Sequence, residues 1–310
     1  MPIRVSTLRG DVKIKFNAYV RVAGKHILLC REGDSFEGER LARLKGKKLT
    51  KMYIPVEQEP SYQAYQAENL ERAFDSKNPK SIEIRAQIVH GLLQAASDDF
   101  MELPESETLY SAIKDRTQKF MRLSIVEPDL LTHILEIKNV DFSVSHHAVN
   151  VAALSLAIAQ EMKMIESHGI QMGPMIMGAL VHDIEHIYNN INFTVPASEL
   201  TKPEKSIHGN HAMAGHYRLK AFKHIDPTIL VIASQHEERL DGSGPRKIFE
   251  RDLDLIGMVV AAANDFEHYL LHGGLTPKEA LKKMLIEKMG LIHLEAMRGL
   301  QEALKKRQIF

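Results

Sequence analysis

Most of the chain repeats apolar residues at the three- and four-residue spacing of an amphipathic helix. After residue 60 this spacing predicts helices at Tyr65–Phe74, Ser81–Met101, Ser106–Leu123, Pro128–Ile137, His146–Met164, Pro174–Tyr188, Ile207–Phe222, Pro227–Glu238, Leu253–His272 and Pro277–Ile309. Strong period-two alternation does not occur in this part of the sequence, so the pattern predicts an all-helical domain.

The first sixty residues follow a different pattern. Val12–Val22 alternates in part, and His26–Cys30 and Lys51–Pro55 are short runs typical of strands. Asp34 and Ser35 are suited to begin a short helix that runs to Leu44, whereas proline and polar residues predict a linker at Glu57–Ser61. We therefore expect a mainly α protein with a small α+β domain at residues 1–60, a helical connecting region at 61–140 and a helical domain at 141–310.

Composition excludes several classes of protein. The 40 basic and 40 acidic side chains cancel, so no global field attracts a nucleic-acid polymer or an anionic membrane. Cys30 is the single cysteine, which rules out a disulfide framework or a thiolate metal cluster. The N-terminus lacks the apolar segment of a signal peptide, and no apolar run reaches the ~18 residues of a membrane span. We expect a cytoplasmic protein.

Histidine is the unusual residue of this sequence, because ten of the 16 lie between His146 and His236. Chemistry is expected at His147 in SHHAVN, His182-Asp183 in GALVHDIEHI, His211 in HAMAG, His236 in QHEERLDGSG and Asp265 in NDFEHY. A single histidine on a helix is more often a packing residue than a ligand. A whole set at the ends of apolar helices, followed by a glycine-rich loop, instead favours a metal site.

Imidazole and carboxylate ligands together suit iron, manganese or zinc better than magnesium or calcium. Asp183 has two oxygens and can bridge two cations while histidines complete each coordination sphere. Two metals ~3.5–4 Å apart polarise a phosphoryl oxygen and lower the pKa of a bridging water for in-line attack. The sequence therefore predicts a binuclear hydrolytic centre.

The order HxxN, HD, HxxxG and HExxxDGSG, from about Phe142 to Gly274, resembles the HD-GYP branch of the HD-domain phosphohydrolases. The resemblance implies an all-helical HD-domain bundle that hydrolyses cyclic di-GMP at a non-haem iron or manganese centre. It also implies two divalent metal ions, with iron expected and manganese or zinc as alternatives. By position, His147, His182, Asp183 and Asp265 would bind the first metal, Asp183 would bridge, and His211 and His236 would bind the second.

The sequence departs from the family pattern at several positions. DGSGYP reads DGSGP, HHE is matched by Gln235-His236-Glu237, and His186 stands where the family has a phosphate-binding lysine. Ser143 replaces the glutamate that some members use for a third metal, which favours two metals. Asn264 competes with Asp265 as the last ligand, and we choose Asp265 because a carboxylate neutralises metal charge. The arginine-rich segment of the family reads LHGGLT at 271–276.

The leading hypothesis is a phosphodiesterase for cyclic di-GMP or a related cyclic dinucleotide, with Asp183, His186 and Glu237 as catalytic residues. Substrate contacts are expected from His186 and from the loop residues Asp241, Gly242, Ser243 and Gly244. One alternative is a weak or inactive receptor that binds the dinucleotide and signals through a partner protein. Another is a phosphohydrolase of a different nucleotide. The N-terminal domain carries no recognisable chemistry and is expected to be a scaffold or a partner-binding module.

Overall fold

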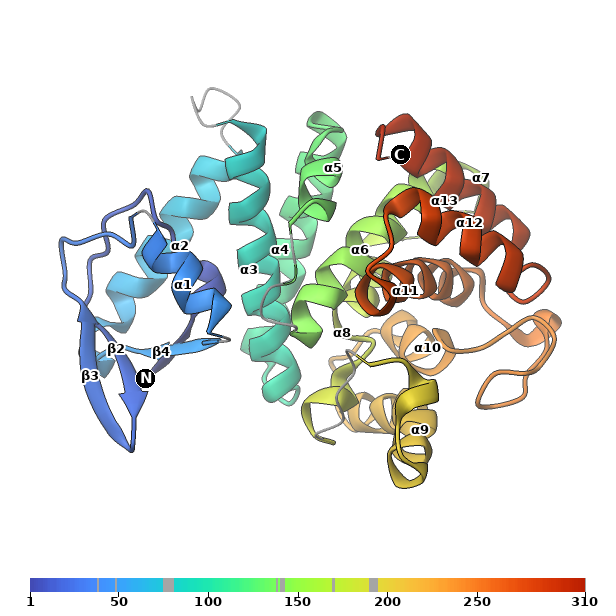
Figure 1. The fold of residues 1–310 in the computed structure, drawn as a ribbon, viewed down its shortest axis with the longest axis horizontal. Helices are drawn as coiled ribbons and strands as arrows, with labels where there is room; N and C mark the ends of the chain where they lie inside the picture. The colour runs from blue at the N-terminus through green and yellow to red at the C-terminus, as the bar shows by residue number, and fades with distance from the viewer. Residues whose placement is uncertain are drawn as a thin grey trace.

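The computed structural model describes residues 1–37, 39–47, 49–74, 81–137, 139, 143–168, 171–189 and 195–309. The expected boundary between residues 140 and 141, and the start of the family resemblance at Phe142, lie outside these residues. Helices make up most of the described chain, which confirms the predicted mainly α class with a small N-terminal sheet (Figure 1).

The N-terminal sheet has four antiparallel strands in the order β1-β4-β2-β3. They are β1 (Pro2–Arg4), β2 (Ala18–Val22), β3 (Lys25–Cys30) and β4 (Lys51–Tyr53), with α1 (Glu39–Gly46) and a 3-10 turn at Val5–Thr7 beside them. The hairpin β2–β3 and the returning strand β4 follow the predicted pattern. β1 was not predicted, because three residues are too few to show alternation.

The predicted linker at Glu57–Ser61 is wrong, because these residues continue from a 3-10 turn at Val56–Gln58 into α2 (Glu59–Phe74). Pro60 lies in the first turn of α2, where a missing backbone N–H breaks no helical hydrogen bond. Tyr62 and Tyr65 then pack edge-on against Phe16, with ring centroids 5.5 and 5.6 Å away. The apolar core of the N-terminal sheet therefore includes side chains of α2.

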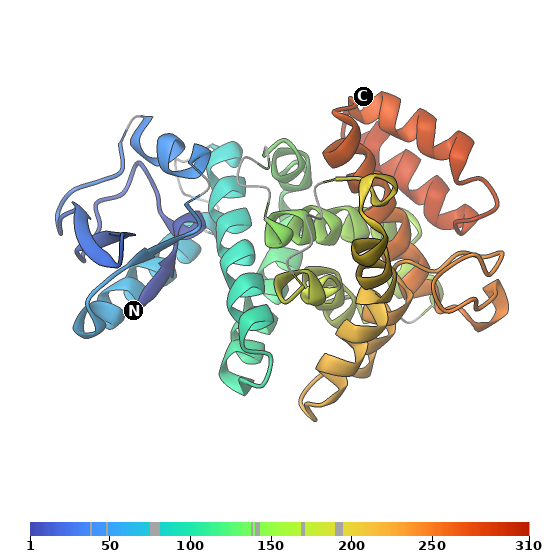
Figure 2. The ribbon, with the colours of Figure 1, turned by 60° about the horizontal axis from the view of Figure 1, so that its bottom comes forward.

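Apart from Ala73 of α2 and the turn residues Ile184, Ile225 and Ile292, the buried residues of the larger core lie on the helices that follow α2. They are α3 (Ile82–Glu102), α4 (Glu107–Val126), α5 (Leu130–Leu135), α6 (Val144–Glu161), α7 (Met164–His168), α8 (Met172–Val181), α9 (Lys202–Lys220), α10 (Pro227–Gln235), α11 (Leu255–Gly273), α12 (Pro277–Glu287) and α13 (Leu294–Lys306), with 3-10 turns at Ile184–Ile187, Ala197–Glu199 and Glu250–Asp252. α6 lies at the centre, packed against α3, α8, α11 and α13 (Figure 2). Its alanines, serines and aliphatic residues are buried on all sides, which lets these neighbours approach it closely.

Two predicted helices are interrupted in the structure. The segment Pro277–Ile309 forms α12 and α13, separated by a turn in which Gly290 has a φ of 80° that other residues adopt only with strain. The segment Pro174–Tyr188 ends its α-helix at Val181 and resumes as a 3-10 turn at Ile184. Asp183 lies in the break, with φ −97° and ψ 25°. This interruption matters for the site, because the Asp183 side chain does not have to point in the direction that a continuous helix would give it.

The N-terminal sheet is held to the helical region through α3. Arg4 of β1 is buried and makes ion pairs with Asp98, Asp99 and Glu102 of α3, at 3.7, 2.9 and 3.0 Å. Among the described helices, none combines the length and the apolar character required to cross a bilayer.

Candidate metal centre

Asp183 lies at the centre of a cluster of buried imidazoles contributed by four elements. Its Oδ2 is 3.6 Å from His147 Nε2 of α6 and 3.4 Å from His182 Nε2 at the end of α8. Its Oδ1 is 3.3 Å from His211 Nε2 of α9 and 3.2 Å from His236 Nε2 at the end of α10. Each carboxylate oxygen thus faces its own close pair of histidines, with His186 Nε2 a further 3.9 Å neighbour of Oδ1, which is the arrangement expected of a bridging ligand.

Backbone carbonyls fix the orientation of three of these rings. His182 Nδ1 donates to Ala179 O at 2.8 Å, His236 Nδ1 donates to Ala233 O at 3.1 Å, and His211 Nδ1 donates to His208 O. Because Nδ1 of each ring is used in this way, Nε2 is the nitrogen that each ring directs at Asp183. Hydrogen bonds of this kind are typical of metal-binding histidines, because they set the tautomer and the ring direction.

His147 is oriented by a carboxylate instead. Its Nδ1 donates to Glu267 Oε2 at 2.5 Å, and the other oxygen of Glu267 accepts from Asn150 Nδ2 at 3.2 Å. Burial lowers the pKa of His147, but the Glu267 charge outweighs burial and raises it. The HxxN spacing therefore has a physical role, because Asn150 holds the carboxylate that holds the ligand histidine.

The cluster fits divalent cations. His211 Nε2 and His236 Nε2 are 2.9 Å apart although both Nδ1 atoms already donate to carbonyls, so without a cation this contact needs a proton shared between the two rings. Burial lowers the pKa of His211, but the Asp183 carboxylate outweighs burial and raises it to about 9. Asp183 Oδ1 and His182 Nε2 are buried without a hydrogen-bond partner among the described residues. Burial alone would raise the pKa of Asp183, but His182 and His186 lower it well below its usual value. An ionised carboxylate surrounded by inward-facing imidazole nitrogens is a set of ligand atoms that divalent cations would satisfy in place of protons.

Asn264, and not the predicted Asp265, points into this cluster from α11. Asn264 Oδ1 lies 3.0 Å from His147 Nε2, and its Nδ2 donates to Glu237 Oε1 at 3.0 Å. The carboxylate of Asp265 turns away and forms ion pairs with Arg239 at 2.9 Å and Lys288 at 3.4 Å. Adjacent residues on a helix point about 100° apart, so only one of the two can face the centre. The structure therefore brings Asn264 into the cluster and leaves the predicted ligand Asp265 outside it.

The residues around His236 also differ from the expected register. The side chain of Gln235 accepts from the backbone N–H of Asp254 at 2.8 Å, at the start of α11, and so does not replace an imidazole of the cluster. Glu237 instead places a carboxylate oxygen within 4.8 Å of the ligand atoms of His211 and His236. Burial would raise the pKa of Glu237, but Arg239 and the neighbouring imidazoles lower it. Glu237 is therefore an anionic candidate ligand beside the second pair of histidines.

Comparisons with known proteins agree with this geometry. Residues 129–294 match the HD domain family model, and these residues are just over half of the chain. The solved structure of Bd1817, described as an HDG"Y"P protein from Bdellovibrio bacteriovorus, is 37% identical, covers 98% of this chain and 99% of its own, and superposes with a TM-score of 0.91. The chain belongs to the HD-GYP family.

A curated relative is more distant in sequence. The cyclic di-GMP phosphodiesterase of Thermotoga maritima is 28% identical over 215 residues, which are 58% of this chain. The aligned part is 57% of that protein, so the chain spans little more than half the length of this relative.

The loop that stands where the HD-GYP family has its GYP motif packs on the protein itself. Gly242 has a φ of 77°, which allows the turn, and a Cβ at Gly244 would lie 2.5 Å from Glu238 Oε2. Glu238 Oε1 accepts from Arg246 N at 2.9 Å, and Asp241 Oδ1 accepts from Ser243 N at 2.9 Å. These contacts explain the glycines by loop closure, without any need for a phosphate.

A cavity of about 370 Å³ opens beside the metal centre. Basic and imidazole groups share its wall with apolar residues and with the carboxylates of Glu237 and Asp265. The basic and imidazole residues are His186, His208, Arg239, His268, His272, Lys283 and Lys288, and the apolar ones are Val195, Pro196, Ala197 and Leu200. The predicted substrate loop, Asp241–Gly244, is not among the described residues that line this cavity. Burial lowers the pKa of His186 to about 3, so this ring is neutral and offers a phosphate one N–H at most.

The sequence interpretation missed Arg239, Lys283 and Lys288 as cationic groups of the site. It also missed Glu267 and His268 on α11 and His208 on α9, although spacing could have shown them. His208 precedes the predicted ligand His211 by three residues, and residues three or four apart share a helix face. The lysines of α12 gave no such signal, because only the fold brings α12 beside α11.

Proposed function

We propose that this protein is a metal-dependent phosphodiesterase that hydrolyses a cyclic dinucleotide, cyclic di-GMP or a close relative. The observation that carries the proposal is the division of the Asp183 carboxylate between two pairs of buried histidines, beside a cavity with three cationic side chains. The Thermotoga relative supports the choice of substrate. His147, His182 and Asn264 would hold one metal, His211, His236 and Glu237 the other, and Asp183 would bridge them.

Two bound divalent metals would polarise a phosphoryl oxygen and lower the pKa of the attacking water. The mixed nitrogen and oxygen donors suit iron, with manganese or zinc as alternatives. Arg239 and Lys288 line the cavity, and in this proposal they would attract the phosphate groups of the substrate in place of the missing arginine-rich segment. Arg239 is itself held by Asp265, so Asp265 is a positioning residue in this proposal.

The test is hydrolysis of cyclic di-GMP by protein loaded anaerobically with Fe(II) or Mn(II), with the products separated by chromatography. Asp183→Ala should lower turnover by at least about 100-fold, because both metals lose their shared ligand. Asp252→Ala, at an exposed acid outside the cluster, is the matched control and should leave turnover unchanged. Absence of turnover in the metal-loaded wild type would contradict the proposal.

A receptor that binds the dinucleotide without hydrolysis is the second candidate. The neutral His186 in the position of a lysine, together with the missing tyrosine, favours it. Calorimetry showing binding without product would support the receptor, whereas turnover would exclude it.

The third candidate is a phosphohydrolase of another phosphoester, and assays with a panel of nucleotides and other cyclic dinucleotides would distinguish it from the first. Whether the protein is the phosphodiesterase or the receptor, we propose that its N-terminal sheet is the surface that contacts a partner protein.

A further inference from the structure

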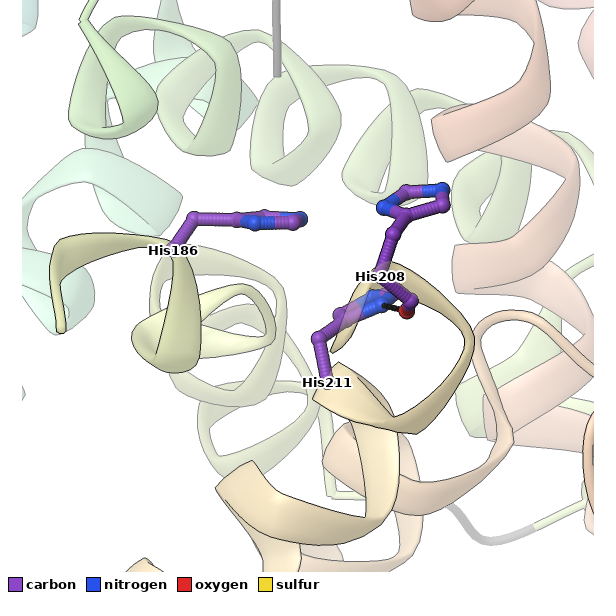
Figure 3. Close-up of side chains that lie close together, drawn as sticks. All are labelled: His186, His208 and His211. Atoms are coloured by element: carbon purple, nitrogen blue, oxygen red, sulfur yellow. Dashed lines mark hydrogen bonds between the residues drawn. The ribbon is translucent and has the colours of Figure 1, made fainter. Parts of the chain in front are cut away.

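A third group of imidazoles lies next to the metal centre, on the side of the cavity. His186 projects from the 3-10 turn after Asp183, and its ring points toward that of His208 on α9, one turn from His211 (Figure 3). The ring centroids are 4.6 Å apart for His186 and His211, 5.0 Å for His208 and His211, and 5.6 Å for His186 and His208. The three rings are stacked within 25° of parallel.

The nitrogens of this group are close enough to share a cation. One ring nitrogen of each histidine lies within 4.8 Å of the others. Zinc-like cations bind imidazole at about 2.0–2.1 Å, so tetrahedral ligand nitrogens are roughly 3.4 Å apart. Binding one cation would therefore require the three stacked side chains to rotate, because an imidazole lone pair lies in the plane of its ring and must point at the metal. His208 Nδ1 is a buried atom without a hydrogen-bond partner among the described residues, although the residue as a whole is only half-buried.

The donor set indicates the kind of cation. Three imidazoles, with Asp183 Oδ1 3.9 Å from His186 Nε2, suit borderline transition metals such as zinc, iron(II), cobalt(II) or nickel, and not magnesium or calcium. His186 and His208 also line the cavity, so a cation bound there would have an open coordination position toward solvent.

His211 belongs to both groups, which restricts how they are occupied. Its Nδ1 donates to His208 O, so only Nε2 is left to bind metal, and that atom also faces Asp183 and His236. A single imidazole nitrogen binds one cation at a time. The two positions that use His211 are therefore alternatives for the same metal.

We propose that the second metal has two positions: an inner one at Asp183, His211, His236 and Glu237, and an outer one at His186, His208 and His211. The proposal rests on the metal centre of the proposed function and adds a path into it. A cation arriving through the cavity first meets the outer imidazoles, and a swing of the His211 ring passes it to the inner ligands.

Cobalt(II) binding tests the outer position without any substrate. We would count bound Co(II) after gel filtration and follow its visible absorption in His236→Ala, which removes an inner ligand only. His236→Ala should still bind two equivalents, the second with an altered spectrum, because the outer imidazoles remain. The double variant His208→Ala/His236→Ala should bind one. His216→Ala/His236→Ala is the matched control, since His216 lies on the same helix outside the cluster, and it should bind two.

Loss of the second equivalent in His236→Ala itself would overturn the proposal, as would its retention in the double variant with His208→Ala. Circular dichroism checks the fold of each variant, and Glu237→Gln provides the same comparison if His236→Ala does not fold. Because the readout is metal content, a wild type without phosphodiesterase activity would refute the proposed function and leave this test intact.

Discussion

Asn264 and Asp265 are neighbours on α11, yet their side chains lie in different chemical surroundings. Asn264 faces His147 and Glu237, whereas Asp265 neutralises the guanidinium of Arg239. Burial raises the pKa of Asp265, while Arg239 and Lys288 oppose that effect. The amide is therefore part of the metal environment, and the carboxylate belongs to the wall of the cavity.

Replacing each residue should separate these roles. Asn264→Ala should weaken binding of the first metal by about 10–100-fold, because a donor beside His147 is lost. Asp265→Asn should change metal affinity by less than about threefold and should instead raise KM, because Arg239 loses the partner that positions it. Competition with a chromogenic chelator measures the metal affinities. Equal loss of metal affinity in both variants would show that the two side chains are not divided in this way.

At the scale of helices, the site depends on how closely α8 and α10 approach each other. α8 delivers His182 and Asp183, and α10 delivers His236. The contact is made at Gly178, where a Cβ would lie 2.4 Å from Ile232 Cδ1 and 3.1 Å from Ile232 Cβ. A glycine in mid-helix is usually unfavourable, so its presence here is explained by the helix spacing that the metal ligands require.

Gly178→Ala should therefore destabilise the protein by roughly 1–3 kcal/mol and lower its metal affinity, because α8 must move away from α10. Gly209→Ala is the matched control, since Gly209 lies inside α9 and a Cβ there meets nothing within 4 Å. That variant should gain about 0.5–1 kcal/mol from helix propensity. Urea unfolding of both apo variants gives the stabilities. A Gly178→Ala protein as stable as wild type would contradict the proposed spacing constraint.

For the molecule as a whole, the N-terminal sheet and the helical region meet at one closely packed junction. A Cβ at Gly91 of α3 would lie 2.1 Å from Ser6 O in the turn after β1. Beside this contact the buried Arg4 faces three carboxylates of α3. Packing and charge both join the two parts here.

Gly91→Ala should lower the free energy of unfolding by about 2 kcal/mol or more, because backbone atoms on both sides must separate. The metal ligands lie elsewhere, so Co(II) stoichiometry of the folded variant should stay unchanged. Limited proteolysis provides a second measurement: cleavage between the sheet and α3 should become faster than in wild type. A variant with wild-type stability and proteolysis would show that the junction adapts to the added methyl group.

The same junction should give the protein a pH-dependent stability. Burial raises the pKa of Asp98 from 3.8 to about 6, although Arg4 opposes the rise. Between about pH 4 and 6 the folded state therefore holds this proton more tightly than the unfolded chain does. The contribution of Asp98 to the free energy of unfolding should therefore fall by roughly 1–3 kcal/mol as the pH rises through that window.

Asp98→Asn removes the titrating group, so the variant should gain stability relative to wild type as the pH increases from about 4 to 6. Urea unfolding of the two apo proteins at several pH values measures this difference directly. Comparing the pair cancels the titration of the histidine cluster, which both proteins share. A constant difference across the window would contradict the raised pKa.

The sequence by itself determined which residue types gather and on which helices. Helical spacing, the excess of histidine and the motifs around His147, His182 and His236 were enough to predict a helical bundle with a binuclear site. These features are local, because a helix places residues on its faces by a fixed repeat. For the same reason the break at Asp183 was missed, since a non-helical residue between two helical turns leaves the apolar spacing almost unchanged.

Only the tertiary structure decided which side chain of each helix reaches the centre. Asn264 instead of Asp265, and Glu237 instead of Gln235, follow from the rotation and tilt of α10 and α11 within the bundle. The cavity that joins His208 to Lys288 depends on how α9, α11 and α12 are placed in space. Rotation and tilt are set by packing between residues far apart in the chain, and no single segment of sequence contains that information.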